Sequence, residues 1–429
     1  FQPASAKAKH KALPKRAAPP VISTHEGGCG GGAAAESADK NGSLFMNHQG
    51  PGEIRVKIGP IMNTCAPSSA ELSQHIAHAI TAAGGWLGFD RFMHLALYAP
   101  GLGYYANDSL KLGAMPADGS DFVTAPELSS LYGQTLAAQV IEALQHTATH
   151  EVWEFGAGSG ALAEQVLTTL QAQGVLLERY TIVDVSGSLR QRQQARLAAF
   201  GDVVQWADHL PPAMHGVVLG NEVLDAMPVQ LLARIDGTWH ERGVALGDGG
   251  AFIWSDRPTP LRPPLEIEGG HDYLTEIHAQ AEAFMRTLAA HLKRGAAFFI
   301  DYGFGEDEYY HPQRSMGTLV CHQRHKMDSD PLADVGGKDI TAHVNFTGSA
   351  VAAQDAGFDI LGYTSQGHFL LNCGFTAKTD ALTLSQRALA GKLVLEHEMG
   401  ELFKVLGLCK GVPPWPALGF AHGDRTHRL

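Results

Sequence analysis

Short apolar segments alternate with amphipathic segments along the chain from residue 151 onward. The apolar segments have the length of buried strands, and the amphipathic segments have the period of helices. Such alternation predicts βαβ units, which build a parallel sheet with helices on both faces. We therefore predict a doubly wound α/β core, with strands at 151–155, 179–185, 203–206, 216–220 and 296–301 and helices at 161–172, 188–199, 272–293 and 345–356.

The segments on either side of this pattern predict further parts. A Ser68-x-x-Glu71 capping box opens a helix through Ala82, and helices at 88–97 and 128–144 complete an N-terminal helical subdomain over 62–148. The core spans 149–376, with insertions near 230–270 and 303–340, the first containing a hairpin-like stretch at 230–255. Strands at 359–363 and 369–373 precede a C-terminal helical extension over 377–429, with helix expected at 380–409.

Residues 1–61 show no hydrophobic period and are rich in Ala, Pro, Lys and Gly. This composition predicts a disordered segment, or one foreign to the native protein, because Met62 directly precedes the first helical pattern. A transit peptide is the competing interpretation, since residues 1–25 are basic and acid-free. We accordingly expect a cytoplasmic protein, or one of the mitochondrial matrix if the segment is a transit peptide.

Charge changes the picture of possible partners. Residues 1–61 carry eight Lys and Arg against four Asp and Glu, which leaves 24 basic and 40 acidic residues for the rest. An acidic body repels phosphate backbones, so we expect no nucleic-acid partner. No apolar run reaches the length of a membrane span. The five cysteines form no Cys-x-x-Cys pair and the histidines no metal-ligand spacing, so we predict reduced thiols and no metal site.

The first predicted strand ends in the glycine-rich loop Glu154-Phe-Gly-Ala-Gly-Ser-Gly160. In an open parallel sheet, ligands bind at the carboxyl ends of the strands, and glycines let a ligand approach the main chain. With Ala161 the loop also satisfies the Gly-x-Gly-x-x-Ala dinucleotide pattern, so NAD(P) is a possible ligand. Glu154 favours a ligand with an ammonium group over a pyrophosphate. The predicted cofactor-binding residues here are Glu154, Gly156, Ala157, Gly158 and Gly160.

Acidic residues also follow the next two strands. Asp184 comes 24 residues after Gly160, where a carboxylate suits the hydroxyls of a ribose. The alternative is a solvated acid at a strand end. Asp208 follows the third strand, where we expect contacts to an adenine.

The fourth strand leads into Asn221-Glu-Val-Leu-Asp-Ala-Met-Pro228. Two carboxylates just past an apolar strand can bind a guanidinium or an amine and offset its charge. We therefore predict Asn221, Glu222 and Asp225 as catalytic residues, with Asn221 also contacting the cofactor. The alternative is a helix start capped by Asn and acids, and both can hold. Asp301, at the end of the fifth strand, is a further residue expected to face the cleft.

A series of motifs occurs in order along residues 64–410. They are Phe92-Met-x-x-Ala-Leu-Tyr98, Gly103-Tyr-Tyr105, Asp121-Phe-Val-Thr-Ala-Pro-Glu127, the Glu154 and Asn221 loops above, Asp301-Tyr-Gly303, Asp339-Ile-Thr-Ala-His-Val-Asn-Phe346 and Gln366-Gly-x-Phe-Leu-Leu371. In this series the chain resembles the MidA-type methyltransferases, which are related to a mitochondrial complex I assembly factor that methylates protein arginine.

The resemblance implies a class I methyltransferase (Rossmann-like) fold and S-adenosylmethionine as cofactor. It also implies that Thr124, Pro126 and Glu127 line the substrate cleft. Asp184 departs from the Glu that the family usually carries at the ribose, and Glu164 stands where Asp is frequent.

The leading hypothesis is an S-adenosylmethionine-dependent methyltransferase that modifies a protein side chain, with arginine favoured as acceptor. Two alternatives stay open: an NAD(P)-dependent oxidoreductase, and a non-catalytic assembly factor that keeps the methyltransferase fold. The expected partner is a protein substrate, without nucleic acid or membrane.

Overall fold

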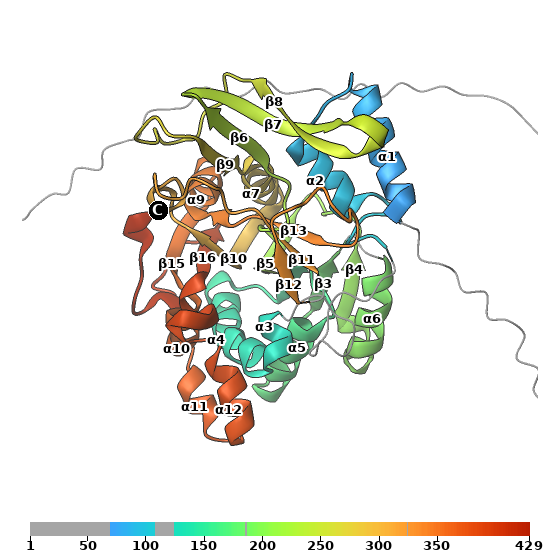
Figure 1. Cartoon of the computed structure of the whole chain (residues 1–429). Helices are drawn as coiled ribbons and strands as arrows, with labels where there is room; N and C mark the ends of the chain where they lie inside the picture. The colour runs from blue at the N-terminus through green and yellow to red at the C-terminus, as the bar shows by residue number, and fades with distance from the viewer. Residues whose placement is uncertain (1–68, 108–123, 185–186, 324) are drawn as a thin grey trace, which may run out of the picture. The chain divides into compact units, whose positions relative to one another are not determined.

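An eight-stranded sheet forms the centre of the computed structural model, which describes residues 69–107, 124–184, 187–323 and 325–429 (Figure 1). Its strand order is β15-β16-β10-β5-β2-β3-β4, with β14 beside β10. The strands are β2 (Glu151–Phe155), β3 (Arg179–Val183), β4 (Val204–Ala207), β5 (Met214–Asn221), β10 (Leu292–Phe304), β14 (Val344–Asn345), β15 (Asp359–Ser365) and β16 (Phe403–Lys410).

The order of the parallel strands creates a switch point. From β2 the chain adds β3 and β4 on one side, then returns to place β5 on the other side of β2. Strand β10 pairs in parallel with β5, whereas β16 is antiparallel to both β10 and β15. Ligands of open α/β sheets bind where the strand order reverses, which here is between the carboxyl ends of β2 and β5.

Each face of this sheet has its own hydrophobic core, because side chains alternate along a strand. In β10, Phe298 points into the core with α4 (Leu131–Thr147) and α5 (Ala161–Ala172), and Phe299 points into the core with α7 (Ala279–His291) and α9 (Phe346–Asp355). The predicted doubly wound α/β core is therefore confirmed. Helix α6 (Gly187–Leu197) follows β3.

Two smaller sheets lie beside the core. One contains β1 (Leu87–Gly88), β6 (Gln230–Ile235), β7 (Thr238–Leu246), β8 (Phe252–Pro258) and β9 (Tyr273–Ile277), which confirms the hairpin predicted at 230–255. The other contains β11 (Val320–Gln323), β12 (Lys326–Asp328) and β13 (Asp339–Thr341). Helices α1 (Ser69–Ala82) and α2 (Phe89–Tyr98) share a hydrophobic core with β6 and β7 and lie beside them in Figure 1.

Three predicted elements are wrong. The helix expected at 272–293 is strand β9 followed by α7, because Tyr273–Ile277 pairs with β6. The strand expected at 369–373 lies mostly within α10 (Gln366–Asn372), whose cap Ser365 accepts a hydrogen bond from the His368 N–H. The helix expected at 380–409 ends early: α12 (Leu384–Gly391) precedes β16, which pairs on both edges within the central sheet.

Short helices complete the described chain: α3 (Ala125–Leu128), α8 (Glu306–Tyr309) and α11 (Phe375–Thr379). Residues Asn63–Leu429 form one compact unit, so the boundaries expected at 148 and 376 fall inside it. The calls on residues 1–61 and on Ser68 lie outside the described residues. No helix among the described residues is long and apolar enough to cross a membrane. Cys321, Cys373 and Cys409 are buried free thiols.

One testable consequence concerns Gly216 in β5, whose φ is +117°. A Cβ at this position would lie 2.1 Å from the Glu151 carbonyl oxygen on the neighbouring strand. We expect Gly216→Ala to lower the free energy of unfolding by roughly 3 kcal/mol, because both the backbone angle and the contact are unfavourable. Gly249→Ala is the control, since Gly249 has a φ of +73° but open space around it; it should cost about 1 kcal/mol. Urea unfolding followed by circular dichroism measures both, and equal losses would show that the contact does not matter.

Candidate active site

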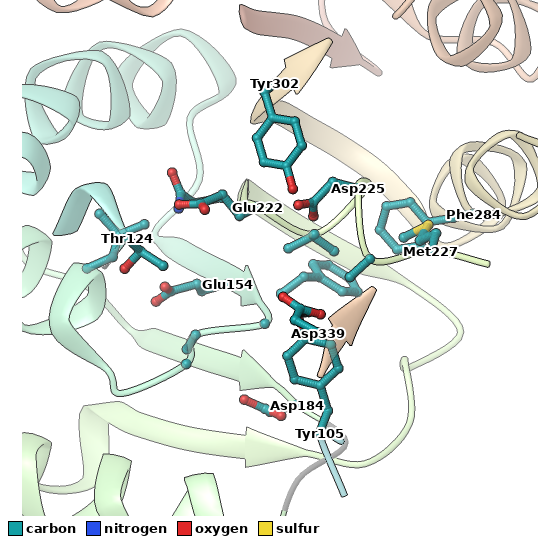
Figure 2. Close-up of a pocket in the computed structure, with 18 of the residues that line it drawn as sticks. Tyr105, Thr124, Glu154, Asp184, Glu222, Asp225, Met227, Phe284, Tyr302 and Asp339 are labelled. Carbon is teal, nitrogen blue, oxygen red and sulfur yellow. Dashed lines mark hydrogen bonds between the residues drawn. The ribbon is translucent and has the colours of Figure 1, made fainter. Parts of the chain in front are cut away.

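A cavity of about 1060 Å³ opens at the switch point between β2 and β5 (Figure 2). The loops after β2, β3 and β5 supply one part of its wall, and α2, α7 and β13 supply others. Of the residues predicted from the sequence, those that line it are Thr124, Pro126, Glu154, Gly156, Ala157, Gly158, Asp184, Asn221, Glu222 and Asp225. Glu127, Gly160, Asp208 and Asp301 are not among its lining residues.

The glycine-rich loop turns by means of backbone angles that side chains disfavour. Gly156, Gly158 and Gly160 have φ values of +62°, +55° and +83°. The Gly156 N–H donates to the Val183 carbonyl at 3.0 Å, which ties the loop to β3. Gly160 is the residue before α5 and sits against Gln193, behind the cavity wall. The result is bare main chain at the cavity surface beside a helix start, as the sequence predicted.

Glu154 lies at the carboxyl end of β2 and is buried. The Tyr180 hydroxyl on β3 donates to its carboxylate at 2.6 Å. Burial raises the pKa of Glu154 to about 7, although the Tyr180 hydrogen bond acts in the opposite direction. A buried carboxyl of this kind ionises more readily when a cation binds beside it.

Gln193 on α6 was not predicted from the sequence, yet it connects the glycine-rich loop with Asp184. Its fully buried amide donates to the Gly158 carbonyl at 2.9 Å and to the Asp184 carboxylate at 2.8 Å. Its oxygen accepts a hydrogen bond from the Trp206 indole at 2.9 Å. Gln193 therefore holds the glycine loop and the strand-end acid in a fixed relation, which no local motif reveals.

Glu222 follows β5 with a φ of +53°, a conformation that is unusual for a residue with a side chain. The Asn221 side-chain amide donates to the Glu222 carboxylate at 3.0 Å. The Tyr132 hydroxyl on α4 donates to the Asn221 side-chain oxygen. The pKa of Glu222 is raised to about 8, mainly by burial and secondly by repulsion from the Asp225 carboxylate. The strained residue is thus held by contacts from a separate helix.

Asp225 is buried at the cavity wall, and its Oδ1 has no hydrogen-bond partner among the described residues. Burial raises the pKa of Asp225 to about 6, and the hydrogen bond from the Tyr302 hydroxyl acts in the opposite direction. Figure 2 shows this hydroxyl pointing toward the Asp225 carboxyl. Asp301 accepts the N–H groups of Leu224 and Asp225, at 2.9 and 3.2 Å, from behind the loop. It supports the Asp225 loop and does not face the cavity.

Two other predicted residues make contacts outside the cavity. Glu127 accepts hydrogen bonds from the Ser159 hydroxyl and from Arg196, the latter at 3.0 Å, so it braces the glycine loop. Asp208 has a side chain that is 70% exposed and pairs with Arg190 at 2.6 Å. Their predicted binding roles find no support in these contacts.

Several residues that line the cavity were not predicted as site residues from the sequence. Tyr105 donates to the Asp339 carboxylate at 2.8 Å, and the Tyr98 ring stacks on the Tyr105 ring. Figure 2 shows Tyr105 and Asp339 facing the cavity, with Phe284 and Met227 at another side. They come from elements far apart in the sequence. Tyr98, Tyr105, Met227 and Asp339 could be noticed only through the family motifs, and Phe284 lies in none of those motifs.

Acidic side chains are prominent in the described lining of the cavity. Glu154, Asp184, Glu222, Asp225 and Asp339 line it, and no Lys or Arg is found among its described lining residues. Carboxylates in a partly buried cavity favour a cationic ligand. S-adenosylmethionine fits this wall, because its sulfonium and ammonium groups are cationic. Asp184 lines the same cavity and stays the residue predicted to bind the ribose hydroxyls. The donor would supply an electrophilic methyl group there.

We expect donor binding to depend on pH through Glu154. A cation binds the ionised carboxylate, so below a pKa of about 7 the protein must first lose a proton. Affinity for the donor should therefore rise several-fold between about pH 6 and about pH 8. Isothermal titration calorimetry measures this, and Glu154→Gln should bind more weakly with a flatter pH dependence. An equally steep pH dependence in the variant would remove Glu154 from this role.

Gln193→Leu should weaken donor binding by about tenfold, because the Gly158 carbonyl and the Asp184 carboxylate each lose a buried hydrogen bond. Trp206→Phe is the matched control, since it removes only the bond to the Gln193 oxygen and should change the dissociation constant little. Calorimetry on folded variants gives both values, and unchanged binding by the Leu variant would contradict the positioning role.

Comparison with known proteins gives close structural matches for this arrangement. A crystal structure of a COG1565 superfamily member from Burkholderia thailandensis, bound to S-adenosyl-homocysteine, is 48% identical and has a TM-score of 0.81. The match covers 84% of this chain and 97% of that one. A native crystal structure of a COG1565 superfamily protein from the same organism is 47% identical, with the same coverage and a TM-score of 0.77.

Curated relatives are more distant. The zebrafish (Danio rerio) protein named protein arginine methyltransferase NDUFAF7, mitochondrial, is 27% identical over 78% of this chain and 85% of its own length. The Drosophila melanogaster homologue is also 27% identical, over 77% and 84%.

The model of one protein family matches residues 135–364, just over half of the chain, and is described as "Putative S-adenosyl-L-methionine-dependent methyltransferase". The family decides between the ligands left open for the glycine-rich loop, in favour of the methyl donor over NAD(P). This chain belongs to that family and is an S-adenosyl-L-methionine-dependent methyltransferase.

Proposed function

We propose that this methyltransferase modifies a cationic nitrogen side chain of a protein, with arginine as the favoured acceptor. The observation that carries the proposal is the acidic lining of the cavity beyond Glu154, where the described residues include no Lys or Arg. Glu222 and Asp225 lie there, and their pKa values are raised to about 8 and about 6 by burial. A guanidinium that enters this region offsets the charge of both carboxylates.

The chemistry asks for position more than for acid–base catalysis. The acceptor nitrogen attacks the methyl carbon of the sulfonium in line, and the carbon–sulfur bond breaks with its electrons remaining on sulfur. The nitrogen releases one proton, which the ionised Glu222 or Asp225 carboxylate accepts. Holding these atoms in line supplies much of the rate. Glu222 and Asp225 orient the acceptor and stabilise its positive charge. Their supports, Asn221 behind Glu222 and Asp301 behind Asp225, keep the two carboxylates in place.

The names of the curated relatives support arginine as the acceptor. Each of the two quoted above is named a protein arginine methyltransferase, although only about a quarter of the residues are identical. Those relatives are named mitochondrial and the more similar crystal structures are bacterial. The compartment of this chain therefore stays a prediction.

Glu222→Gln and Asp225→Asn should each bind the donor and lose methyl transfer by about 10²-fold or more, because the acceptor loses charge stabilisation. Incorporation of labelled methyl groups into lysate proteins measures the rate, and amino-acid analysis of the product identifies the methylated residue.

Asp208→Asn is the matched control, because the Asp208 carboxylate lies outside the cavity and pairs with Arg190. It should keep both donor binding and transfer. Full transfer rates in the Glu222 and Asp225 variants would refute their roles, and label on a residue other than arginine would refute the proposed acceptor.

A further inference from the structure

Three apolar side chains line the acid-lined cavity, and two of them are also exposed to solvent. Met327, Met399 and Leu402 all line the cavity, and we call them the apolar lip. Met327 is 74% exposed and Leu402 is 45% exposed, so both reach from the cavity wall into solvent. Met327 belongs to β12, and Leu402 directly precedes β16. Exposed apolar residues are ordinary when scattered, but two that both line one cavity favour a contact surface there.

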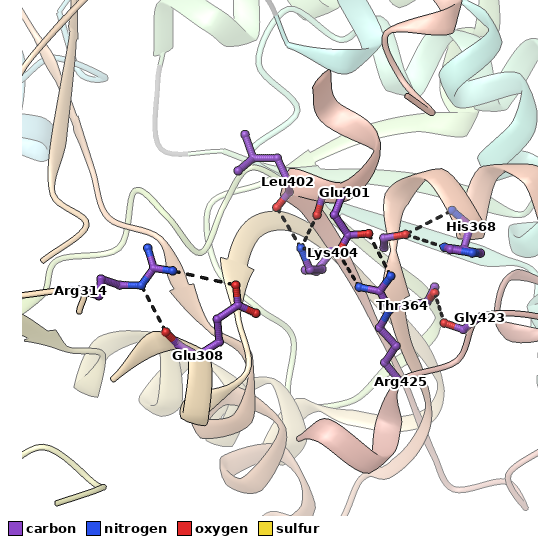
Figure 3. A network of polar contacts seen from close by, with 10 residues as sticks. Glu308, Arg314, Thr364, His368, Glu401, Leu402, Lys404, Gly423 and Arg425 are labelled. Atoms are coloured by element: carbon purple, nitrogen blue, oxygen red, sulfur yellow. Dashed lines mark hydrogen bonds and ion pairs between the residues drawn. The ribbon is translucent and has the colours of Figure 1, made fainter. Parts of the chain in front are cut away.

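Both exposed lip residues have a neighbour that is fixed by an ion pair. Next to Leu402, the Glu401 carboxylate binds the Arg425 guanidinium through both of its oxygens, one of them at 2.9 Å (Figure 3). The buried Lys404 amine donates to the Glu401 carbonyl and, at 3.4 Å, to the Leu402 carbonyl. The backbone that carries Leu402 is therefore held from two sides.

The Met327 side is anchored in a similar way. Asp328 pairs with the Lys338 amine at 2.9 Å and accepts the Asp330 N–H at 2.9 Å. Strand β12 also pairs with β11, which pairs in turn with β13. Because the backbone that carries each exposed lip residue is already fixed, a partner that covers the side chain does not have to order the main chain, which lowers the entropy cost of binding.

We infer that the apolar lip receives an apolar side chain that neighbours the methyl-accepting residue of a protein substrate. The inference rests on the proposed function, because the acidic wall selects the cationic acceptor and the lip then contacts the adjoining residues of the same polypeptide. The cavity therefore offers a substrate two kinds of contact. Its carboxylates bind the cation, and the exposed side chains of Met327 and Leu402 contact the apolar neighbour of that cation.

The test uses two synthetic peptides with a single central arginine, flanked on both sides by Leu in one and by Ser in the other. Wild-type enzyme with labelled S-adenosylmethionine should methylate the Leu-flanked peptide with a kcat/KM about tenfold higher, the range that one apolar contact provides. Arginine amide, which has no flanking residues to reach the lip, serves as the reference acceptor.

Leu402→Ser and Met327→Ser should each reduce this preference several-fold while leaving donor binding and the rate on arginine amide unchanged. Serine is used because an acidic replacement would itself attract the cationic acceptor. The matched controls are Leu384→Ser and Met316→Ser, since Leu384 is 85% exposed and Met316 is 80% exposed and neither lines the cavity. Both controls should keep the wild-type preference.

The outcomes separate the two proposals. Equal rates on the two peptides, or a preference that survives both lip variants, overturns the lip while leaving the arginine acceptor in place. Absence of methylarginine from both peptides and from arginine amide refutes the arginine acceptor, and the lip inference falls with it. A change in molecular mass of the Leu402 variant by light scattering would assign the lip to contacts between copies of this chain and overturn the inference.

Discussion

The gathering of several carboxyl groups in a partly buried cavity is the constraint on which the rest of the site depends. Taking a carboxylate out of water is unfavourable unless a cation or hydrogen-bond donors replace the water. Here the replacements include hydroxyls and amides, such as those of Tyr180 and Asn221, while the described lining holds neither Lys nor Arg. The pKa values of Glu154 and Glu222 are accordingly raised to about 7 and about 8. The cavity is most stable electrostatically when cations fill it.

The fold brings together carboxylates that are far apart in the sequence, such as Glu154 and Glu222. The carboxyl ends of β2 and β5 are adjacent only because the strand order reverses there, which sets Glu154 near Glu222. Polar supports then come from outside each loop: Gln193 behind the donor side and Asp301 behind Asp225. Loops with such supports can keep an unfavourable geometry, as the left-handed Glu222 illustrates.

Much of this could be predicted from the sequence, for identifiable reasons. The alternating pattern gave the parallel core, and α5 has the predicted bounds because a glycine loop and a regular apolar period mark both of its ends. Strand β16 was missed since its pairing partners lie about 40 and 110 residues away, and a local period cannot report them. Gln193 was missed for the same reason: a buried amide between two loops leaves no spacing signal. Asp208 follows its strand as expected, but Arg190 turns it outward.

If the donor and the proposed acceptor bind along the same carboxyl groups, binding of the donor favours subsequent binding of the acceptor. The sulfonium and ammonium of the donor are positive, so their arrival lowers the pKa values of the nearby carboxyl groups, Glu222 included. A carboxyl that is mainly protonated in the free protein thereby becomes a carboxylate, the form that the proposed guanidinium acceptor requires. Methyl transfer then removes the charge on sulfur, and the carboxyl groups regain affinity for protons. The same electrostatics that make the empty cavity unfavourable thus couple donor binding to acceptor binding, without any movement of the chain.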